Sequence, residues 1–321
     1  MILLRLAAMA IAAALALPAA AQDWPTRPLR IIVPFPAGGS ADVQARVIAD
    51  ELAKAVGQPV LIDNKPGAGG SIGAGEAARS APDGYTLFMA TTGTHSSNIS
   101  LYPKLPYDPE KDFAPLTLVT IYPQVVVPGQ RYPQKSLPEL VDALKQAGGS
   151  ANYGSSGVGS PTHLGAELFK RETGTQMVHV PYRGQGPALN DLLGGRLDVM
   201  FPSVPDVLSF VQAGQLRAVA IMAERRSAAL PDVPTTAELG QPQLLSSIWS
   251  GLYIRAGTPA PIVERLNREI VRILQLPVFK DKFEGMGFDV RPTTPQEFGA
   301  FAAAETGRWG DIIRSLNIRL E

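Results

Sequence analysis

The 321-residue sequence has no cysteine and only three histidines, His95, His163 and His179. Without thiols, the chain can form neither disulfide bonds nor thiolate metal sites. It also lacks an HxxxH pair, which would place two histidine ligands on one helix face. We therefore expect no bound metal and no cofactor.

The sequence also lacks an excess of charge, since 29 basic residues face 29 acidic ones. One of the basic residues, Arg5, belongs to the apolar leader described next, so 28 basic and 29 acidic residues remain without it. Such a balance provides no field that would attract nucleic acid or an anionic membrane. We expect no nucleic-acid partner.

Long hydrophobic runs are missing except near the N-terminus. Arg5 precedes an unbroken apolar stretch at residues 6–17, and three alanines at 19–21 precede Gln22. The stretch is shorter than the roughly 20 residues that a membrane-spanning helix needs, which favours a cleaved signal peptide over an uncleaved anchor. We predict a signal peptide at 1–21 and, in a bacterium, a periplasmic protein. With no cysteine at the cleavage point, it is not a lipoprotein.

The remaining chain alternates strand-like and helix-like segments, which predicts an α/β fold with parallel sheets. Val43, Val47, Leu52 and Val56, for example, recur at helical spacing. The strand-like runs lie at 29–33, 60–64, 85–90, 114–119, 124–127, 151–153, 177–180, 199–202, 216–221 and 251–255.

About 300 residues are too many for one ordinary core and suit two lobes. No linker-like tract divides the chain, so we expect it to cross between the lobes twice, within 114–127 and within 244–254. The predicted first lobe comprises residues 22–121 and 250–321, and the second comprises 122–249.

Three glycine-rich stretches follow predicted strands, at 38–40, 67–73 and 154–160. A helix N-terminus after such a stretch offers free backbone N–H groups and a partial positive charge to an anion. A dinucleotide is disfavoured, because the second stretch lacks the acid or arginine expected at the end of the next strand, and there is no GxxxxGK[ST]. An exported hydrolase that uses Ser156 and His163 stays an alternative, although no GxSxG elbow surrounds Ser156.

Binding without turnover is the remaining interpretation. Glycine loops from two lobes can face each other across a cleft and neutralise a carboxylate with N–H and hydroxyl groups. The segment 91–98, TTGTHSSN, adds short polar side chains after a predicted strand. Such groups recognise a carboxylate but not what is attached to it, so dicarboxylates, citrate-like acids, acidic amino acids and aromatic acids stay open.

The successive stretches VPFPAGGSAD, NKPGAGGSIGAGEAARSAPDGYTL, SLYPKLPYDPEKDFAPLTLV, YGSSGVGSPTHLGAELF and VPYRGQGPALNDLLGGRLDVMF resemble motifs of the tripartite tricarboxylate transporter substrate-binding proteins, the TctC or Bug family. The resemblance extends from about Trp24 to Leu316. It implies a type II periplasmic binding protein fold, with two α/β lobes joined by two crossing segments around a ligand cleft. It also implies a monomeric receptor, without enzyme activity, that delivers a small carboxylate to a membrane transporter. A ligand-presenting sensor subunit is an alternative that the sequence does not separate from transport.

The resemblance also implies a set of ligand-binding residues. Asp42 is equally consistent with a helix cap, and Arg183 with a surface turn. Because Ser96, Ser97 and Asn98 follow His95 where relatives often carry aliphatic residues, a hydroxylated or amino-bearing ligand is favoured. The implied residues are Phe35, Gly38, Gly39, Ser40, Asp42, Thr92, Thr94, His95, Asn98, Ser155, Ser156, Ser160, His163, Arg183 and Asp206.

Overall fold

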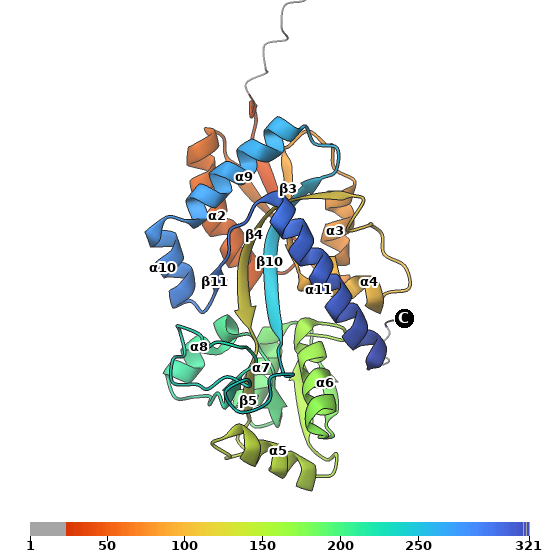
Figure 1. Ribbon diagram of the computed structural model, residues 1–321, viewed down its shortest axis with the longest axis vertical. Helices are drawn as coiled ribbons and strands as arrows, with labels where there is room; N and C mark the ends of the chain where they lie inside the picture. Colours follow the sequence, from red (N-terminus) through yellow and green to blue (C-terminus); the bar gives the residue numbers. More distant parts are fainter. Residues whose placement is uncertain (1–23, 317, 319, 321) are drawn as a thin grey trace, which may run out of the picture.

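The computed structural model describes residues 24–316, 318 and 320, and the predicted leader lies outside them. The described chain forms two α/β lobes that lie one above the other along the long axis of the molecule (Figure 1). The residue limits predicted for the lobes stay a prediction, and we define each lobe by its sheet. No helix in the described part of the chain is long and apolar enough to span a membrane.

The first lobe is built on a six-stranded sheet with the order β11-β4-β10-β3-β1-β2. β1 pairs in parallel with β2 and β3, whereas β10 runs antiparallel to both β3 and β4. The predicted parallel pairing therefore holds for β1, β2 and β3 but not for β10, which leads back into this lobe after β4 has led out of it. Its strands are β1 (Leu29–Val33), β2 (Val60–Asn64), β3 (Thr86–Thr91), β4 (Phe113–Pro123), β10 (Ser247–Arg255) and β11 (Asp289–Val290).

Helices cover both faces of this sheet (Figure 1). On α2, Leu52 and Val56 lie on the buried face as predicted, but Val43 and Val47 are only half-buried. Small alanines complete the buried face and let the helix approach the sheet closely. The helices are α2 (Ser40–Val56), α3 (Ser71–Ala78), α4 (Asn98–Leu101), α9 (Ala260–Leu274), α10 (Pro277–Gly285) and α11 (Pro295–Ser315), with a 3-10 turn at Ala68–Gly70 and a π-helix at Gly93–Ser97.

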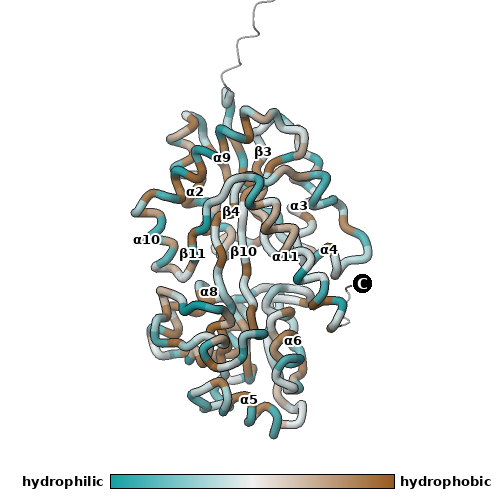
Figure 2. The backbone as a smooth tube through the Cα atoms, viewed as in Figure 1, coloured by the Kyte–Doolittle hydropathy of each residue, from teal (hydrophilic) through white to brown (hydrophobic). Residues whose placement is uncertain are grey.

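The second lobe has a smaller five-stranded sheet with the order β7-β6-β8-β5-β9. Teal and brown alternate along α5 in this lobe, and along α9 in the first (Figure 2), as expected for helices with one buried face. Its elements are β5 (Val125–Pro128), α5 (Leu137–Gln146), β6 (Asn152–Ser155), α6 (Pro161–Thr173), β7 (Val178–Pro181), α7 (Gln185–Leu193), β8 (Val199–Met200), α8 (Val204–Gln212) and β9 (Ala220–Ile221).

The chain passes between the lobes at Gln124, which lies between β4 and β5, and returns before β10. The Gln124 side chain is completely buried and donates to the carbonyl oxygens of Pro161 and Phe201, at 3.1 and 2.8 Å. The hydroxyl of Ser246, on the returning segment, donates to the same amide. One glutamine therefore joins both crossings to the second lobe.

Helix α11 reaches from the first lobe to the second (Figure 1). It begins with a capping box, in which the Thr294 hydroxyl accepts from the Glu297 N–H and the Glu297 carboxylate accepts from the Thr294 N–H. Beyond its end, the Leu320 N–H donates to the Leu101 carbonyl at 2.9 Å. Leu320 therefore lies beside the glycine-rich stretch at 154–160, the second-lobe glycine loop. A Cβ on Gly159 of this loop would lie 2.8 Å from Leu320 Cδ1.

Candidate ligand site

The loop that opens α2 is organised by Asp42. This carboxylate is 1% exposed and accepts hydrogen bonds from Gly38 N, Arg46 Nε and Asn64 Nδ2, at 2.8, 2.9 and 3.0 Å. Burial alone would raise the pKa of the carboxyl, but the bonds from Arg46, Gly38 and Asn64 hold that pKa below its usual range. Asn64 also donates to the Phe35 carbonyl at 3.0 Å. Asp42 thus fixes the shape of the loop and occupies the Gly38 N–H, but it forms no cap hydrogen bond with α2.

The N-terminus of α2 itself is open. No side chain caps it, and the backbone N–H groups of Ser40 and Ala41 have no hydrogen-bond partner among residues 24–316. The Ser40 hydroxyl donates across the lobe junction to Asp206 Oδ1 at 3.1 Å. Gly39, just before Ser40, is exposed. The predicted first-lobe loop therefore faces the second lobe.

Asp206 lies in the first turn of α8 and also accepts a bond from the Ser203 hydroxyl at 2.6 Å. Burial raises the pKa of the Asp206 carboxyl despite these bonds.

Arg183 is exposed in the turn before α7 and forms no ion pair with any residue that the structure describes. The Gly184 N–H ties this turn to the Ser156 carbonyl at 3.2 Å.

The second-lobe glycine loop connects β6 to α6. Ser160 caps α6 by accepting from the His163 N–H at 3.3 Å, and it donates to the Gly157 carbonyl at 2.7 Å. Ser156 pairs with Thr162 through its N–H, at 2.9 Å, and through its hydroxyl, at 3.0 Å. These internal bonds fix the loop in one shape, so it presents a preformed surface to the first lobe.

Two stacked histidine rings pack against this loop and bond to it. His163 and His179 lie 4.1 Å apart with an angle of 11° between their planes. The Gly159 N–H donates to His163 Nδ1 at 3.1 Å, and Ser155 Oγ lies 2.6 Å from His179 Nε2. Burial lowers the pKa of both rings, that of His179 to about 4.

The hydrolase alternative needs Ser156 to be activated by His163. No hydrogen bond joins these two side chains in the described chain, because His163 Nδ1 accepts from Gly159 and the Ser156 hydroxyl pairs with Thr162. The arrangement holds a loop and provides no base for the predicted nucleophile.

The segment after β3, from which we expected short polar side chains for the site, is buried inside the first lobe. Thr92 Oγ1 accepts from the Trp249 N–H at 2.9 Å, Thr94 Oγ1 donates to the Thr91 carbonyl at 3.2 Å, and Asn98 donates to the Gly69 carbonyl at 3.1 Å. Their side chains stabilise the sheet edge and the second glycine loop. Ser96 and Ser97 are completely buried as well, which removes the argument that they favour a hydroxylated ligand.

His95 is a core residue. Its ring is 3% exposed and lies 4.2 Å from the Tyr253 ring and 4.9 Å from the Phe113 ring. Burial among these aromatic side chains lowers its pKa to about 3. The structure thus places this predicted ligand contact in the aromatic core, and it is not among the groups that we propose for the ligand.

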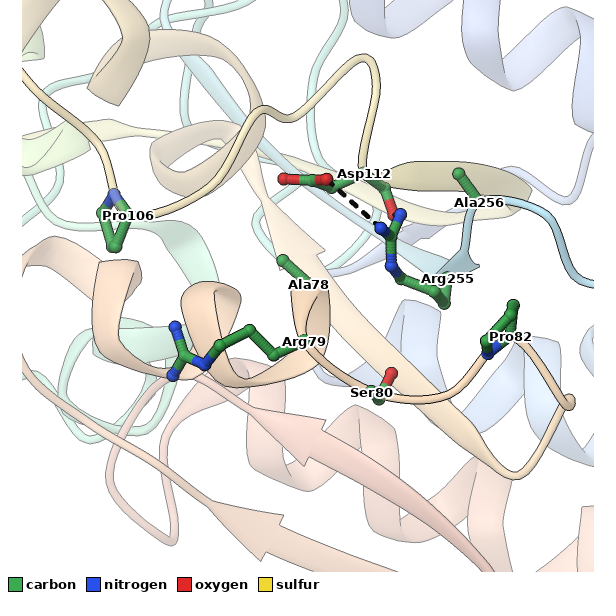
Figure 3. Close-up of a pocket in the computed structure, with 8 residues that line it drawn as sticks. All are labelled: Ala78, Arg79, Ser80, Pro82, Pro106, Asp112, Arg255 and Ala256. Atoms are coloured by element: carbon green, nitrogen blue, oxygen red, sulfur yellow. Dashed lines mark hydrogen bonds and ion pairs between the residues drawn. The ribbon is translucent and has the colours of Figure 1, made fainter.

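Sequence reasoning included Thr91, in the segment 91–98, but missed the polar cluster that lies beside it next to the α2 N-terminus, formed with Gln44, Thr120 and Ser250. Two cavities lie elsewhere, and neither includes any of the fifteen predicted residues. One, of about 460 Å³, lies between the Arg255–Asp112 pair and Arg79 (Figure 3). The other, of about 650 Å³, adjoins both crossing segments.

The described residues include no group of three or more His, Asp or Glu side chains that could hold a metal.

Two lobes joined by two crossings, with an open helix N-terminus at their junction, define a solute-binding protein. Two solved structures from Rhodopseudomonas palustris share this architecture. Rpa4515, solved with adipate, is 34% identical with a TM-score of 0.88, and the match covers 92% of this chain and all of that one. MatC (Rpa3494), solved with bound malate, is 34% identical with a TM-score of 0.82, and the match covers 90% and 100% of the two chains. The predicted periplasmic binding protein fold is confirmed.

The model of the tripartite tricarboxylate transporter family receptor matches residues 44–318. Protein BugT of Bordetella pertussis (strain Tohama I) is 38% identical over 310 residues, which cover 96% of this chain and 95% of BugT. The chain therefore belongs to the tripartite tricarboxylate transporter receptor family, as its motifs indicated.

Proposed function

We propose that this protein is a periplasmic, monomeric receptor that captures a small organic carboxylate between its lobes and delivers it to a tripartite tricarboxylate-type transporter. The observation that carries the proposal is the Ser40–Asp206 contact, because it brings the uncapped end of α2 against the second lobe. A ligand held there contacts both lobes at once, and its binding energy favours the closed form.

A carboxylate suits this position chemically. The free N–H groups of Ser40 and Ala41 and the positive end of the α2 dipole stabilise negative charge without an arginine. The bound adipate and malate of Rpa4515 and MatC support a carboxylate as the ligand class. The second-lobe loop with Ser155, Ser156 and Ser160 supplies the opposing surface. Membership of the receptor family and the predicted leader support periplasmic delivery.

Thermal melting of residues 22–321 against a panel of carboxylates and neutral analogues tests the proposal. The protein is first unfolded and refolded to remove any ligand retained during purification. A ligand at about 100 times its dissociation constant adds roughly 2.7 kcal/mol to stability, a shift of several degrees. We expect such a shift for at least one carboxylate, with no conversion of it. A flat response to the whole panel, or turnover, contradicts the proposal.

The variant Gly39→Trp tests whether the ligand binds at the α2 loop. Its Cβ would lie 3.5 Å from the Pro36 carbonyl, an ordinary contact, so the ring should fill the cleft without strain in the loop. We expect the ligand-induced shift to disappear while the ligand-free melting temperature changes little. Gly285→Trp is the matched control, because a Cβ there meets nothing within 4 Å. An equal effect of the two variants would place the ligand elsewhere.

A further inference from the structure

The side chain of Gln124 connects three other segments of the chain. It is 0% exposed, and its Nε2 donates to the carbonyl oxygens of Pro161 at 3.1 Å and of Phe201 at 2.8 Å. The Ser246 hydroxyl, on the returning crossing, donates to Oε1. Both amide N–H groups and the amide oxygen therefore have partners. A buried amide bonded in this way holds the groups around it in a fixed arrangement and is costly to replace.

The backbone around Gln124 takes part in the same network. Its N–H donates to the Ser246 carbonyl at 2.9 Å, which joins the outgoing crossing to the returning one. The Met222 N–H donates to the Gln124 carbonyl at 2.8 Å, and the Val125 N–H donates to the Pro202 carbonyl at 2.9 Å. Met222 follows β9 and Pro202 follows β8, so the crossing is bonded to the second-lobe sheet on both sides.

The start of α6 is the first segment that the Gln124 side chain holds. Pro161 directly follows Ser160, which caps this helix and donates to the Gly157 carbonyl at 2.7 Å. The helix lies so close to the Gln124 amide that a Cβ on Gly165 would overlap Oε1. The position of the second-lobe glycine loop relative to the crossings therefore depends on this contact.

The turn after β8 is the second segment. Phe201 lies just beyond β8, and an isolated bridge pairs Gln124 with Ser203. The Ser203 hydroxyl donates to Asp206 at 2.6 Å, and Ser40 of the first lobe donates to the same carboxylate at 3.1 Å. Gln124 thus holds the part of the second lobe that meets the N-terminus of α2.

We propose that Gln124 is a positioning residue for ligand capture, which holds the glycine loop and the turn after β8 to both crossings. This inference rests on the proposed function and names the residue that couples lobe closure to the site. Because Gln124 is completely buried, it acts on the ligand only through these two segments. With Gln124 in place, both segments move against α2 as one body. Without it, the ligand must order each segment as it binds, which weakens affinity.

Calorimetric titration of Gln124→Met in the refolded residues 22–321 tests the proposal. Methionine has about the same length but no N–H donor, so the carbonyl groups of Pro161 and Phe201 lose their partner. Adipate, malate and the panel carboxylate that stabilises wild type most are titrated at a temperature at which both proteins are folded. We expect the dissociation constant of the tightest of these ligands to rise at least about 10-fold. A purely structural role would lower the melting temperature and leave that constant unchanged.

Hydrogen exchange of the ligand-free proteins gives a second measurement. Amides at 154–160 and 201–206 should exchange about 10-fold faster in Gln124→Met, relative to those of α9 in the first lobe. This result would show that the two segments have lost their common attachment before any ligand is present.

Two control variants separate this role from other effects. Gln130→Met is the matched control, since Gln130 Nε2 also donates to a second-lobe carbonyl, that of Leu193 at 2.6 Å. Leu144→Ala controls for lost stability, because Leu144 packs in the second-lobe core on α5. Both should keep the wild-type dissociation constant.

A wild-type dissociation constant in Gln124→Met overturns the inference and leaves the receptor function intact. If Gln124→Met does not fold, Gly165→Ala decides by the same criterion, because its methyl group displaces the Gln124 amide without removing it. If wild type binds no carboxylate of the panel, the proposed function fails and this inference fails with it.

Discussion

At the scale of single residues, the three histidines share one property. His95, His163 and His179 are each buried enough that the pKa of the ring falls below its ordinary value. Below pH 6.5 the unfolded chain takes up protons that the folded protein does not, so the unfolded state gains stability as the pH decreases. The free energy of unfolding should therefore fall on acidification, starting near pH 6.5.

His95→Phe isolates one of these contributions. The pKa of the His95 ring is about 3 in the folded protein and 6.5 in the unfolded chain. This difference lowers the free energy of unfolding by about 2 kcal/mol when the pH falls from 7 to 5. Phenylalanine fits the surrounding aromatic rings and does not titrate. Urea unfolding at both pH values should therefore show that the variant loses about 2 kcal/mol less than wild type. Equal losses would mean that His95 is charged in the folded protein.

The role of single residues could be predicted from sequence only where local rules decide it. Thr294 precedes a proline and lies three residues before Glu297, which is enough to identify a capping box. His95 and Gln44 could not be placed, because their burial depends on strands and helices far away in the chain. Gln44 contacts Ser250, which is 206 residues distant.

At the scale of elements, α6 shows how the crossing segment constrains a helix. Gly165 lies inside α6, where alanine would normally stabilise by roughly 0.5–1 kcal/mol. A Cβ at this position would lie 2.2 Å from Gln124 Oε1, which is held on several sides. Close approach of helix and crossing segment therefore requires glycine here.

We expect Gly165→Ala to destabilise the protein by about 1–3 kcal/mol, because Gln124 must leave its bonds. Gly307→Ala on α11 is the matched control, since its Cβ meets nothing within 4 Å, and it should stabilise by about 0.5–1 kcal/mol. Chemical unfolding of both variants measures the difference. Stabilisation by Gly165→Ala would mean that α6 and the crossing are not in contact.

Most elements of the fold could be predicted from hydrophobic periodicity, because each strand or helix must bury one face. The predicted strand at 216–221 is reduced to β9 (Ala220–Ile221), and β11 (Asp289–Val290) was not predicted. Both are two residues long, too short to show an alternating pattern. The antiparallel direction of β10 could not be predicted either, because it depends on where the chain leaves and re-enters the lobe.

At the scale of the whole molecule, the lobes are joined by an apolar contact as well as by the crossings. Leu164 of α6 in the second lobe packs with Leu101, Trp309 and Ile313 of the first lobe, and all four are at most 1% exposed. Arg171 also donates to Ser315 at 2.5 Å. Opening of the lobes must expose this apolar surface, so the contact stabilises the closed form.

Leu164→Ala should therefore change the shape of the ligand-free molecule as well as its stability. Leu168→Ala is the matched control, because Leu168 lies on the same helix but packs inside the second lobe. Both changes should cost about 2–4 kcal/mol. Small-angle scattering should show a larger radius of gyration only for Leu164→Ala. An identical radius for both variants would mean that this cluster does not hold the lobes together.

The end of the chain provides a place to observe the motion directly. The Leu320 N–H donates to the Leu101 carbonyl beside Gly159 of the second-lobe loop, so Leu320 lies at the lobe junction. The sequence contains no cysteine, and one appended after residue 321 would be the only thiol available for labelling. An environment-sensitive dye attached there would change its fluorescence as the lobes open and close, and this would convert the receptor into a reagentless optical sensor for its ligand.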